Sequence, residues 1–353
     1  MERRELMQVR ELIAEIEALA PPRWAAAWDQ SGVQAVGERQ DVRKLGVGLD
    51  PTSEMIEQSL AWGADFLLVH HPVALKPGLP ARDNGYAKVL RMVFRQDVWL
   101  YAAHTSLDVQ PRGPVRWLAR ELGLENLQVL EETGRRAGRW FRVLGHAAQL
   151  EELARTLSGY PAVEVYPCGK RAMEVVTAPG GDHQVLRAVS GVEGELLHVV
   201  SQELDMPVEP LGFGFVGDLG QPLPWSTFAA NLERILGGPP RSLAGEAPVM
   251  VRRVACCPGS GASLLGRVGQ AGAQVYVTGD MKYHDAQAAL EQGVLVVDVG
   301  HFVLEERMMR EFAETLRHIL APQGVDVAFF VGSDPLRRGY GNGHSGFGEK
   351  HPQ

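Results

Sequence analysis

Apolar runs that alternate with helical patterns are the feature that most restricts how this chain folds. In roughly the first 125 residues, the runs Leu45–Leu49, Phe66–Val69 and Val98–Ala103 are separated by helical patterns at Ser53–Gly63 and Tyr86–Gln96. This alternation is typical of a parallel sheet covered by helices. The same pattern returns after about residue 245, with predicted strands at Val251–Cys257, Val275–Thr278, Leu295–Val299 and Val325–Val331, and predicted helices at Gly261–Ala271, Asp285–Gln292 and Leu304–Leu320.

The middle of the chain has a different order of elements. The patterns predict strand, helix, strand, strand, helix and strand at Arg139–Gly145, Leu150–Ser158, Val163–Tyr166, Ala172–Ala178, His183–Ser190 and Leu196–Ser201. This βαββαβ order is that of a ferredoxin-like unit. We therefore predict an α/β protein with two related halves, residues 1–130 and 206–335, an inserted ferredoxin-like domain at 134–205, and a disordered tail at 336–353.

Composition narrows the class of protein. The chain of 353 residues is 45% hydrophobic and 22% charged, which is typical of a globular protein, and its net charge of −8 disfavours direct binding to nucleic acid or anionic membranes. No apolar stretch reaches the roughly 20 residues of a membrane helix, and residues 1–19 indicate an amphipathic helix rather than a secretory signal. Three cysteines make no disulfide framework, and adjacent Cys256 and Cys257 are expected to pack as small hydrophobes. We expect a cytoplasmic protein.

Histidines at the ends of apolar runs are the strongest chemical signal. His70 and His71 directly follow Phe66–Val69, and His301 and Glu305 follow another apolar run far downstream. Burying one imidazole without partners costs on the order of 1–3 kcal/mol, and a metal ion offsets that cost because neutral imidazole is a common metal ligand. If the fold joins the two places, the chain forms a metal centre.

Other polar residues also follow predicted strands. Asp50, His104 and Asp280 each end an apolar run, and Asp108 lies four residues after His104. In open α/β sheets, functional sites gather outside the carboxyl ends of the strands. We therefore expect several of these side chains to lie close together.

The spacing of these residues is compatible with two ions. His301 and Glu305 share one face if a helix begins near residue 302. Side chains of His70 and His71 diverge in a regular strand, so each serves a different ion if Glu305 bridges, and Asp108 completes the nearer ion. Mixed histidine and carboxylate ligands suit zinc, iron, manganese or cobalt. We predict two divalent metal ions and leave their identity open.

Structural roles compete with these functional ones. Any one of the histidines, taken singly, could be a buried residue with a purely structural role. Asp108 could likewise cap the turn that follows it. Asp50 precedes Pro51 and is better explained as a cap of the helix that begins at Ser53. The glycine-rich segment CCPGSGASLL offers free backbone N–H groups to an anion, but a tight structural turn explains it better.

A further polar segment, TGDMKYHDA, follows the predicted strand Val275–Thr278. Lys282 is a candidate phosphate contact there, and His284 is a candidate for proton transfer. Solvent-facing loop residues explain both equally well.

Six stretches together resemble a known family, the GTP cyclohydrolase I type 2 homologues, also called the Nif-three-like family. They occur in the expected order and are WDQSGVQ (28–34), LLVHHPV (67–73), YAAHTSLD (101–108), PGSGASLL (258–265), YVTGDMKYHDA (276–286) and VDVGHFVLE (297–305). The first stretch departs from the family pattern, because Gln30 follows Asp29 where members more often have Asn. The resemblance implies two related α/β halves, toroidal hexamers and, in longer members, an inserted domain.

The resemblance also implies a dinuclear site. Its pattern assigns His70 and Asp108 to one ion, His71 and His301 to the second, and Glu305 as the bridge. His104 would lie close by as an additional ligand or a proton carrier.

The leading functional hypothesis is a metal-dependent hydrolase that acts on a nucleotide or a related small molecule. For GTP, hydroxide made available by the two ions would open the guanine imidazole ring and release formate. Lys282 would hold phosphate, and His104 or His284 would shuttle protons. The alternatives are a non-enzymatic protein that regulates, stores or delivers metal, and a transcription-linked binding protein, which the net negative charge disfavours.

Overall fold

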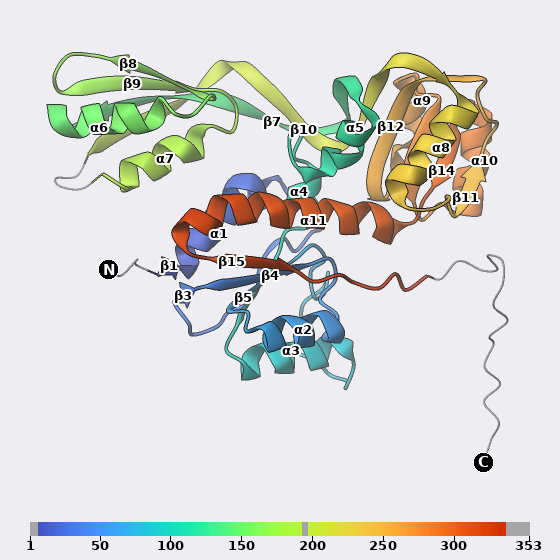
Figure 1. Cartoon of the computed structure of the whole chain (residues 1–353), viewed down its shortest axis with the longest axis horizontal. Coiled ribbons are helices and arrows are strands. Elements are labelled where there is room, and N and C mark those ends of the chain that lie inside the picture. The colour runs from blue at the N-terminus through green and yellow to red at the C-terminus, as the bar shows by residue number, and fades with distance from the viewer. Residues whose placement is uncertain (1–5, 193–196, 337–353) are drawn as a thin grey trace.

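The computed structural model describes residues 6–192 and 197–336, which form a mixed α/β protein with three sheets. A five-stranded sheet makes the lower layer in Figure 1 and carries the first predicted histidines. Four of its strands are parallel neighbours, and the fifth is antiparallel at the edge. In spatial order they are β15 (Asp326–Phe329), β4 (Lys44–Gly48), β5 (Phe66–Val69), β6 (Trp99–Ala102) and β2 (Gly32–Ala35).

Helices cover both faces of this sheet. On one face, α2 (Ser53–Trp62) and α3 (Gly85–Arg95) pack through residues such as Ile56 and Val93. On the other face lies α1 (Val9–Leu19), which follows a short pairing of β1 (Met7–Gln8) with β3 (Asp41–Val42). Local signals set the ends of α2, because the Thr52 hydroxyl accepts the N–H of Met55 and Gly63 adopts a left-handed conformation at the other end.

An eight-stranded sheet makes the second layer. Strands β12, β13 and β14 are parallel neighbours, and the other pairings are antiparallel. In spatial order the strands are β11 (Ser242–Ala244), β14 (Leu295–Asp298), β13 (Val275–Gly279), β12 (Met250–Ser260), β10 (His198–Pro224), β7 (Leu124–Leu144), β9 (Ala172–Thr177) and β8 (Val163–Pro167). Its helices include α6 (Ala147–Leu157), α7 (Asp182–Ser190), α8 (Trp225–Leu236), α9 (Leu265–Gln270) and α10 (Tyr283–Gln292).

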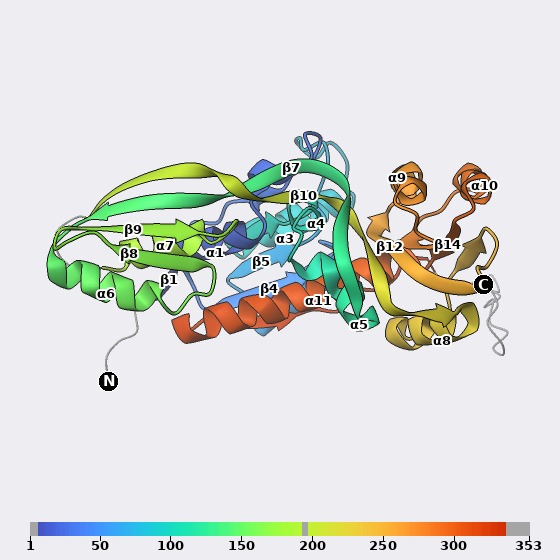
Figure 2. The same cartoon turned by 90° about the horizontal axis from the view of Figure 1, so that it is seen from above.

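Two strands are much longer than the sequence predicts. β7 and β10 pair with each other over most of their length and form a curved ribbon that joins the middle segment to β12 (Figure 2). The sequence predicts only Arg139–Gly145 and Leu196–Ser201 as strand in these places, and residues 193–196 lie outside the described part. Many side chains of the ribbon are exposed, so it lacks the apolar alternation that marks a half-buried strand.

Helix α11 (His301–Leu320) lies between the two large sheets, as Figure 1 shows. Its buried apolar side chains belong to one core cluster that also contains residues of β4 and β5 below and of β12, β13 and β14 above. Trp117 of α5 (Trp117–Leu122) fixes the helix further by donating its indole N–H to the carbonyl of Leu304 at 3.0 Å. The chain then returns to the first sheet, where β15 pairs in parallel with β4.

Most predicted elements of the outer segments have the predicted type, with ends that differ by a few residues. The N-terminal helix begins only at Val9, because Met7 and Gln8 pair with β3. The prediction for the tail falls almost entirely on residues 337–353, outside the described part. Among the helices described, none combines the length and apolar character needed to span a membrane.

Candidate metal centre

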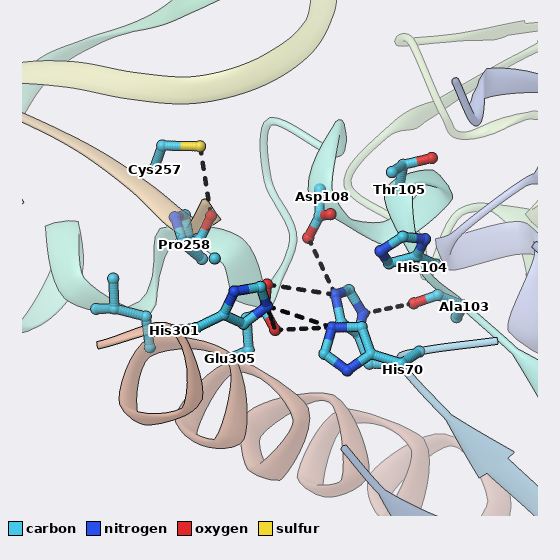
Figure 3. Close-up of polar contacts among 12 residues, drawn as sticks. His70, Ala103, His104, Thr105, Asp108, Cys257, Pro258, His301 and Glu305 are labelled. Atoms are coloured by element: carbon cyan, nitrogen blue, oxygen red, sulfur yellow. Dashed lines mark hydrogen bonds and ion pairs between the residues drawn. The ribbon is translucent and has the colours of Figure 1, made fainter. Parts of the chain in front are cut away.

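Strand ends from both sheets bring four histidines together. His70 and His71 directly follow β5, and His104 follows β6 and precedes α4 (Thr105–Asp108). His301 begins α11, just after β14. The predicted convergence of residues from the two ends of the chain is therefore present, and Figure 3 shows His70, His104 and His301 in one cluster with Glu305.

The Nδ1 atoms of these histidines are each held by a hydrogen bond. Nδ1–H of His70 donates to the backbone carbonyl of Ala103 at 2.8 Å, and Nδ1–H of His71 donates to Oδ1 of Asp50 at 2.7 Å. Since a carbonyl or a carboxylate only accepts, the proton is on Nδ1 in both rings. The Nε2 atoms are thereby left to face the cluster.

The other two histidines have the same arrangement. Nδ1 of His104 lies 2.7 Å from Oδ1 of Asp29, and Nδ1 of His301 lies 2.7 Å from Oδ2 of Asp280. Histidines that bind metal in proteins almost always donate the second ring N–H to a carboxylate or a carbonyl, which fixes the ring and raises its basicity. This pattern supports a ligand role for the cluster.

Glu305 occupies the centre of the cluster and faces different histidines with its two oxygens. Oε1 lies 3.8 Å from Nε2 of His70, whereas Oε2 lies 3.1 Å from Nε2 of His71 and 2.9 Å from Nε2 of His301. The Nε2 atoms of His71 and His301 are 3.4 Å apart. Two groups have the geometry to hold a metal ion, namely His70 with His71 and His104, and His71 with His301 and Glu305.

Asp108 completes the side of the cluster nearest His70. Its Oδ1 lies 3.7 Å from Nε2 of His70, and within the described structure both atoms are buried without a hydrogen-bond partner. An unpaired buried polar atom costs about 1–3 kcal/mol, so two such atoms facing one another are poorly explained by structure alone. A cation between them satisfies both.

Proton affinities in the cluster are strongly perturbed. Burial lowers the pKa of His70 to about 3, and burial raises the pKa of Asp108 well above its usual range, with the nearby charge of Glu305 adding to that rise. Burial disfavours charge on His71 and His301 as well, but hydrogen bonds to carboxylates outweigh it. Asp50 and Glu305 raise the pKa of His71 to about 10, and Glu305 and Asp280 raise the pKa of His301 to about 9. Without a metal, protons supply the positive charge that this cluster attracts.

The glycine-rich turn CCPGSGASLL packs directly against the cluster. Gly259 has φ +69°, and a Cβ at this position would overlap Oε1 of Glu305. A Cβ at Gly261 would likewise overlap the hydroxyl of Tyr276. The glycines are thus required for close approach, in agreement with the structural explanation of this turn.

A cavity of about 430 Å³ opens beside the cluster, and its lining includes His71, His104, Asp108, His301 and Glu305. Lys282 and His284, predicted as substrate-binding and catalytic residues, do not line it. Both are exposed, at the start of α10. Cys256 and Cys257 are buried in β12 as predicted, and Cys257 reaches the wall of the cavity.

The explanation of Asp50 as a helix cap is wrong. Thr52 is the N-cap of α2, while the Asp50 carboxylate binds His71. Asp29 and Asp280 act in the same way on other histidines, although sequence reasoning gave Asp29 no such role and marked Asp280 only as a residue at a strand end. Asp29 also accepts hydrogen bonds from the hydroxyls of Ser31 and Thr105. The presence of Asp29 in the family-like stretch WDQSGVQ was the sequence signal that could have indicated this role.

Comparison with known proteins identifies relatives along nearly the whole chain. A model of the family described as Duf34/NIF3 (NGG1p interacting factor 3) matches residues 7–335. A GTP cyclohydrolase 1 type 2 homolog from Staphylococcus aureus (strain MRSA252) is 26% identical over 357 residues, which covers 88% of this chain and 93% of the relative. One from Halalkalibacterium halodurans is 27% identical over 365 residues and covers 92% and 97%.

Solved structures of related proteins have the same fold as this chain. A Bacillus cereus protein related to NIF3 superposes with a TM-score of 0.74 at 26% identity, covering 94% of this chain and 99% of that one. A Staphylococcus aureus protein gives a TM-score of 0.67 at 21% identity with the same coverage, which supports the fold alone.

Proposed function

Because this chain belongs to the Duf34/NIF3 (NGG1p interacting factor 3) family, we propose that it binds two divalent metal ions and uses them to hydrolyse a nucleotide or a related small molecule. The relatives named GTP cyclohydrolase 1 type 2 homologs support hydrolysis of a ring-containing substrate as the reaction class. Zinc, iron, manganese and cobalt each suit this set of imidazole and carboxylate ligands.

The position of Glu305 carries the proposal. One carboxylate oxygen faces His70, and the other faces His71 and His301. Two ligand atoms on a tetrahedral zinc, each bound at about 2.0–2.1 Å, lie about 3.3 Å apart. The separations of 2.9–3.8 Å around Glu305 are close to that value. We assign His70 and Asp108 to one ion, His71 and His301 to the other, and Glu305 to both.

The protein's own residues have defined tasks in this proposal. A pair of divalent cations would supply Lewis acidity and lower the pKa of bound water, so that hydroxide is available near neutral pH. Asp50, Asp29 and Asp280 keep the rings of their histidines in one orientation and tautomer. His104 directs Nε2 toward the cluster and lines the cavity, so it is placed to accept a proton from water or to return one to a leaving group.

His284 and Lys282 have less support. Nδ1 of His284 lies 3.4 Å from the side-chain oxygen of Gln287, on the exposed surface of α10. Their assignment to proton transfer and phosphate binding requires a substrate that extends beyond the cavity. We retain them as secondary assignments and give the role of proton carrier to His104.

Metal analysis of protein purified without added metal tests the proposal. We expect two ions per chain in the wild type, about one in His71→Ala, and loss of up to both in Glu305→Gln. Glu306→Gln is the matched control, because Glu306 is the next residue of α11, is also buried, and accepts the N–H of Gly332 instead of facing the histidines. Two ions retained in Glu305→Gln contradict the bridge.

A substrate screen tests the enzymatic part. Metal-loaded wild-type protein should turn over at least one of GTP, other nucleotides or phosphoesters, and His104→Ala should lower the rate while keeping both ions. A protein that keeps two tightly bound ions and turns over none of these compounds is not the proposed hydrolase. Rapid transfer of its metal to an acceptor protein would instead favour delivery of metal.

We also propose that residues 134–205 form an inserted ferredoxin-like domain and that the chain assembles into a toroidal hexamer. The neighbouring order β10-β7-β9-β8 and the packing of α6 and α7 on these strands support the first proposal. The second comes from the family resemblance. A native mass about six times the chain mass of 38.6 kDa is expected, and a monomeric mass contradicts it.

A further inference from the structure

The cavity beside the histidine cluster has an apolar wall. Its volume of about 430 Å³ is near the lower end of the roughly 300–1,000 Å³ found for small-molecule pockets. The polar side chains of the histidine cluster make one part of its lining, and hydrocarbon, aromatic and sulfur groups make most of the remainder. These residues include Trp28, Pro72, Leu75, Val115, Phe213 and Cys257.

Trp28 is the largest member of this wall and is 58% exposed. The edge of its ring system meets His104, with ring centroids 5.8 Å apart and planes at 73°. An exposed indole beside a cavity offers a planar apolar surface on which a flat ring stacks favourably. Its position next to His104 places such a ring beside the proposed metal ligands.

The loop that carries Trp28 is firmly held. On one side of it, the N–H of Ala26 donates to the hydroxyl of Thr105 at 2.9 Å. On the other side, the Asp29 carboxylate accepts the N–H of Thr105 at 3.1 Å and the Nδ1–H of His104 at 2.7 Å. The chain on both sides of Trp28 is therefore held relative to the histidine cluster, which limits the free energy that a ligand loses in ordering the indole.

The lining lacks a partner for a highly charged ligand. Among the described residues that line the cavity, none is Lys or Arg. The four positive charges of two divalent cations would also be fully offset by five carboxylates on or directly behind the histidines. These carboxylates are Asp29, Asp50, Asp108, Asp280 and Glu305. Polyphosphates are bound in proteins mainly by Arg, Lys and uncompensated metal charge, which this cavity does not offer.

We propose that the organic ligand is a small, flat ring compound with at most one negative charge, which places one donor group at the metal pair and packs its ring against Trp28. Of the two substrate classes proposed above, this inference favours the related small molecule, such as a nucleobase-like ring, over a nucleotide, whose phosphates carry more than one negative charge. The inference rests on the proposed metal binding, but it is independent of whether the reaction is hydrolysis.

Hydroxamates that share one metal-binding group test the ring preference directly. Acetohydroxamate lacks a ring, benzohydroxamate carries a flat ring, and cyclohexanecarbohydroxamate carries a ring of similar size that is not flat. Calorimetric titration of metal-loaded wild type should give a Kd for benzohydroxamate about tenfold or more below those of the other two.

Trp28→Ala should reduce this advantage to about twofold while leaving the Kd of acetohydroxamate unchanged. Trp140→Ala is the matched control, because Trp140 lies in β7 and does not line the cavity. An equal advantage in wild type and Trp28→Ala overturns the stacking role of Trp28.

A ligand with added negative charge tests the proposed limit of at most one negative charge. Benzohydroxamate with a phosphonate in the para position keeps the ring and the metal-binding group, and should bind about tenfold more weakly than benzohydroxamate itself. Equal or tighter binding overturns the preference for low charge. Metal content measured in the same samples distinguishes failure of the proposed function from failure of this inference. A protein without bound metal refutes the proposed function. A protein with two ions but no preference for the flat ring refutes only this inference.

Discussion

Asp280 adopts a left-handed backbone conformation, with φ 59°, and its Oδ2 lies 2.7 Å from Nδ1 of His301. Such a conformation is uncommon outside glycine, although Asp and Asn tolerate it better than other residues. It turns the chain at the end of β13 so that the carboxylate meets the first residue of α11. An uncommon backbone conformation is thus maintained where it orients a proposed metal ligand.

Asp280→Asn should weaken binding of the ion held by His301 by about 10–100-fold. The amide keeps the tolerance for positive φ and an acceptor oxygen, but it removes the charge that supports the imidazole. Competition with a chelator of known affinity measures the change. Asp97→Asn is the matched control, because Asp97 has φ 51° and lies away from the cluster. A change within twofold for Asp280→Asn would show that the carboxylate is dispensable.

Gly259→Ala should displace Glu305 and lower the metal content. The added Cβ would overlap Oε1 of Glu305, and the carboxylate is the proposed bridge. Gly272→Ala provides a close control, because Gly272 has nearly the same positive φ of +70° but open space around it. Both variants bear the backbone strain of about 1–2 kcal/mol, so only a difference in metal stoichiometry reports on the overlap. Elemental analysis of both proteins measures it.

Metal loading should release protons near neutral pH. In the metal-free protein, hydrogen bonds to carboxylates raise the pKa of His71 to about 10 and that of His301 to about 9 despite burial, so both rings are protonated at pH 7.5. A cation must displace those protons. We expect these rings to release about two protons per chain at pH 7.5 and almost none above pH 11, as measured by calorimetry in buffers of different ionisation enthalpy. Equal release at both pH values would contradict this assignment.

The same shifts predict how the stability of the metal-free protein depends on pH. The folded state favours the protonated histidines, so their contribution is fully present below the unfolded pKa of about 6.5 and is lost as the pH rises through 9 and 10. Denaturant midpoints measured across this range should therefore fall for metal-free protein. Metal-loaded protein is the control, because its histidines stay deprotonated throughout.

Phe312→Ala should destabilise the protein by about 3–5 kcal/mol. Phe312 of α11 is fully buried in the core cluster that joins both large sheets, and its removal leaves a cavity. Urea denaturation measures the change in the free energy of unfolding. Phe94→Ala is the control, because Phe94 is 58% exposed on α3 and should change stability much less. A small effect at Phe312 would mean that α11 does not hold the sheets together.

Local patterns were sufficient for the strand ends that carry the histidines. The runs before His70 and before His301 are short, buried and apolar, so the period and composition of each run indicate the strand directly. The i,i+4 spacing of His301 and Glu305 also predicted that the two side chains share one face, because one helix carries both residues. Metal ligation and the number of ions stay predictions.

Contacts between distant segments were not predictable in the same way. Asp50 reaches His71 across 21 residues and Asp29 reaches His104 across 75. Apart from the place of Asp50 at a strand end and of Asp29 in WDQSGVQ, the local sequence does not distinguish these carboxylates from helix caps or surface residues. The full lengths of β7 and β10 were missed because much of the ribbon is exposed and polar. Its strand character comes from pairing rather than from local propensity.

The parallel pairing of β15 with β4 has a consequence for the growing chain. The edge of the first sheet is completed by a strand that is synthesised some 280 residues after its neighbour β4. Until α11 has been synthesised, the histidines after β5 have neither the neighbouring helix nor its carboxylate, and closing so long a loop is slow. A nascent chain that still lacks α11 therefore holds only part of the proposed ligand set, and the proposed metal pair can bind only after residues 301–305 have been synthesised and have folded onto the first sheet.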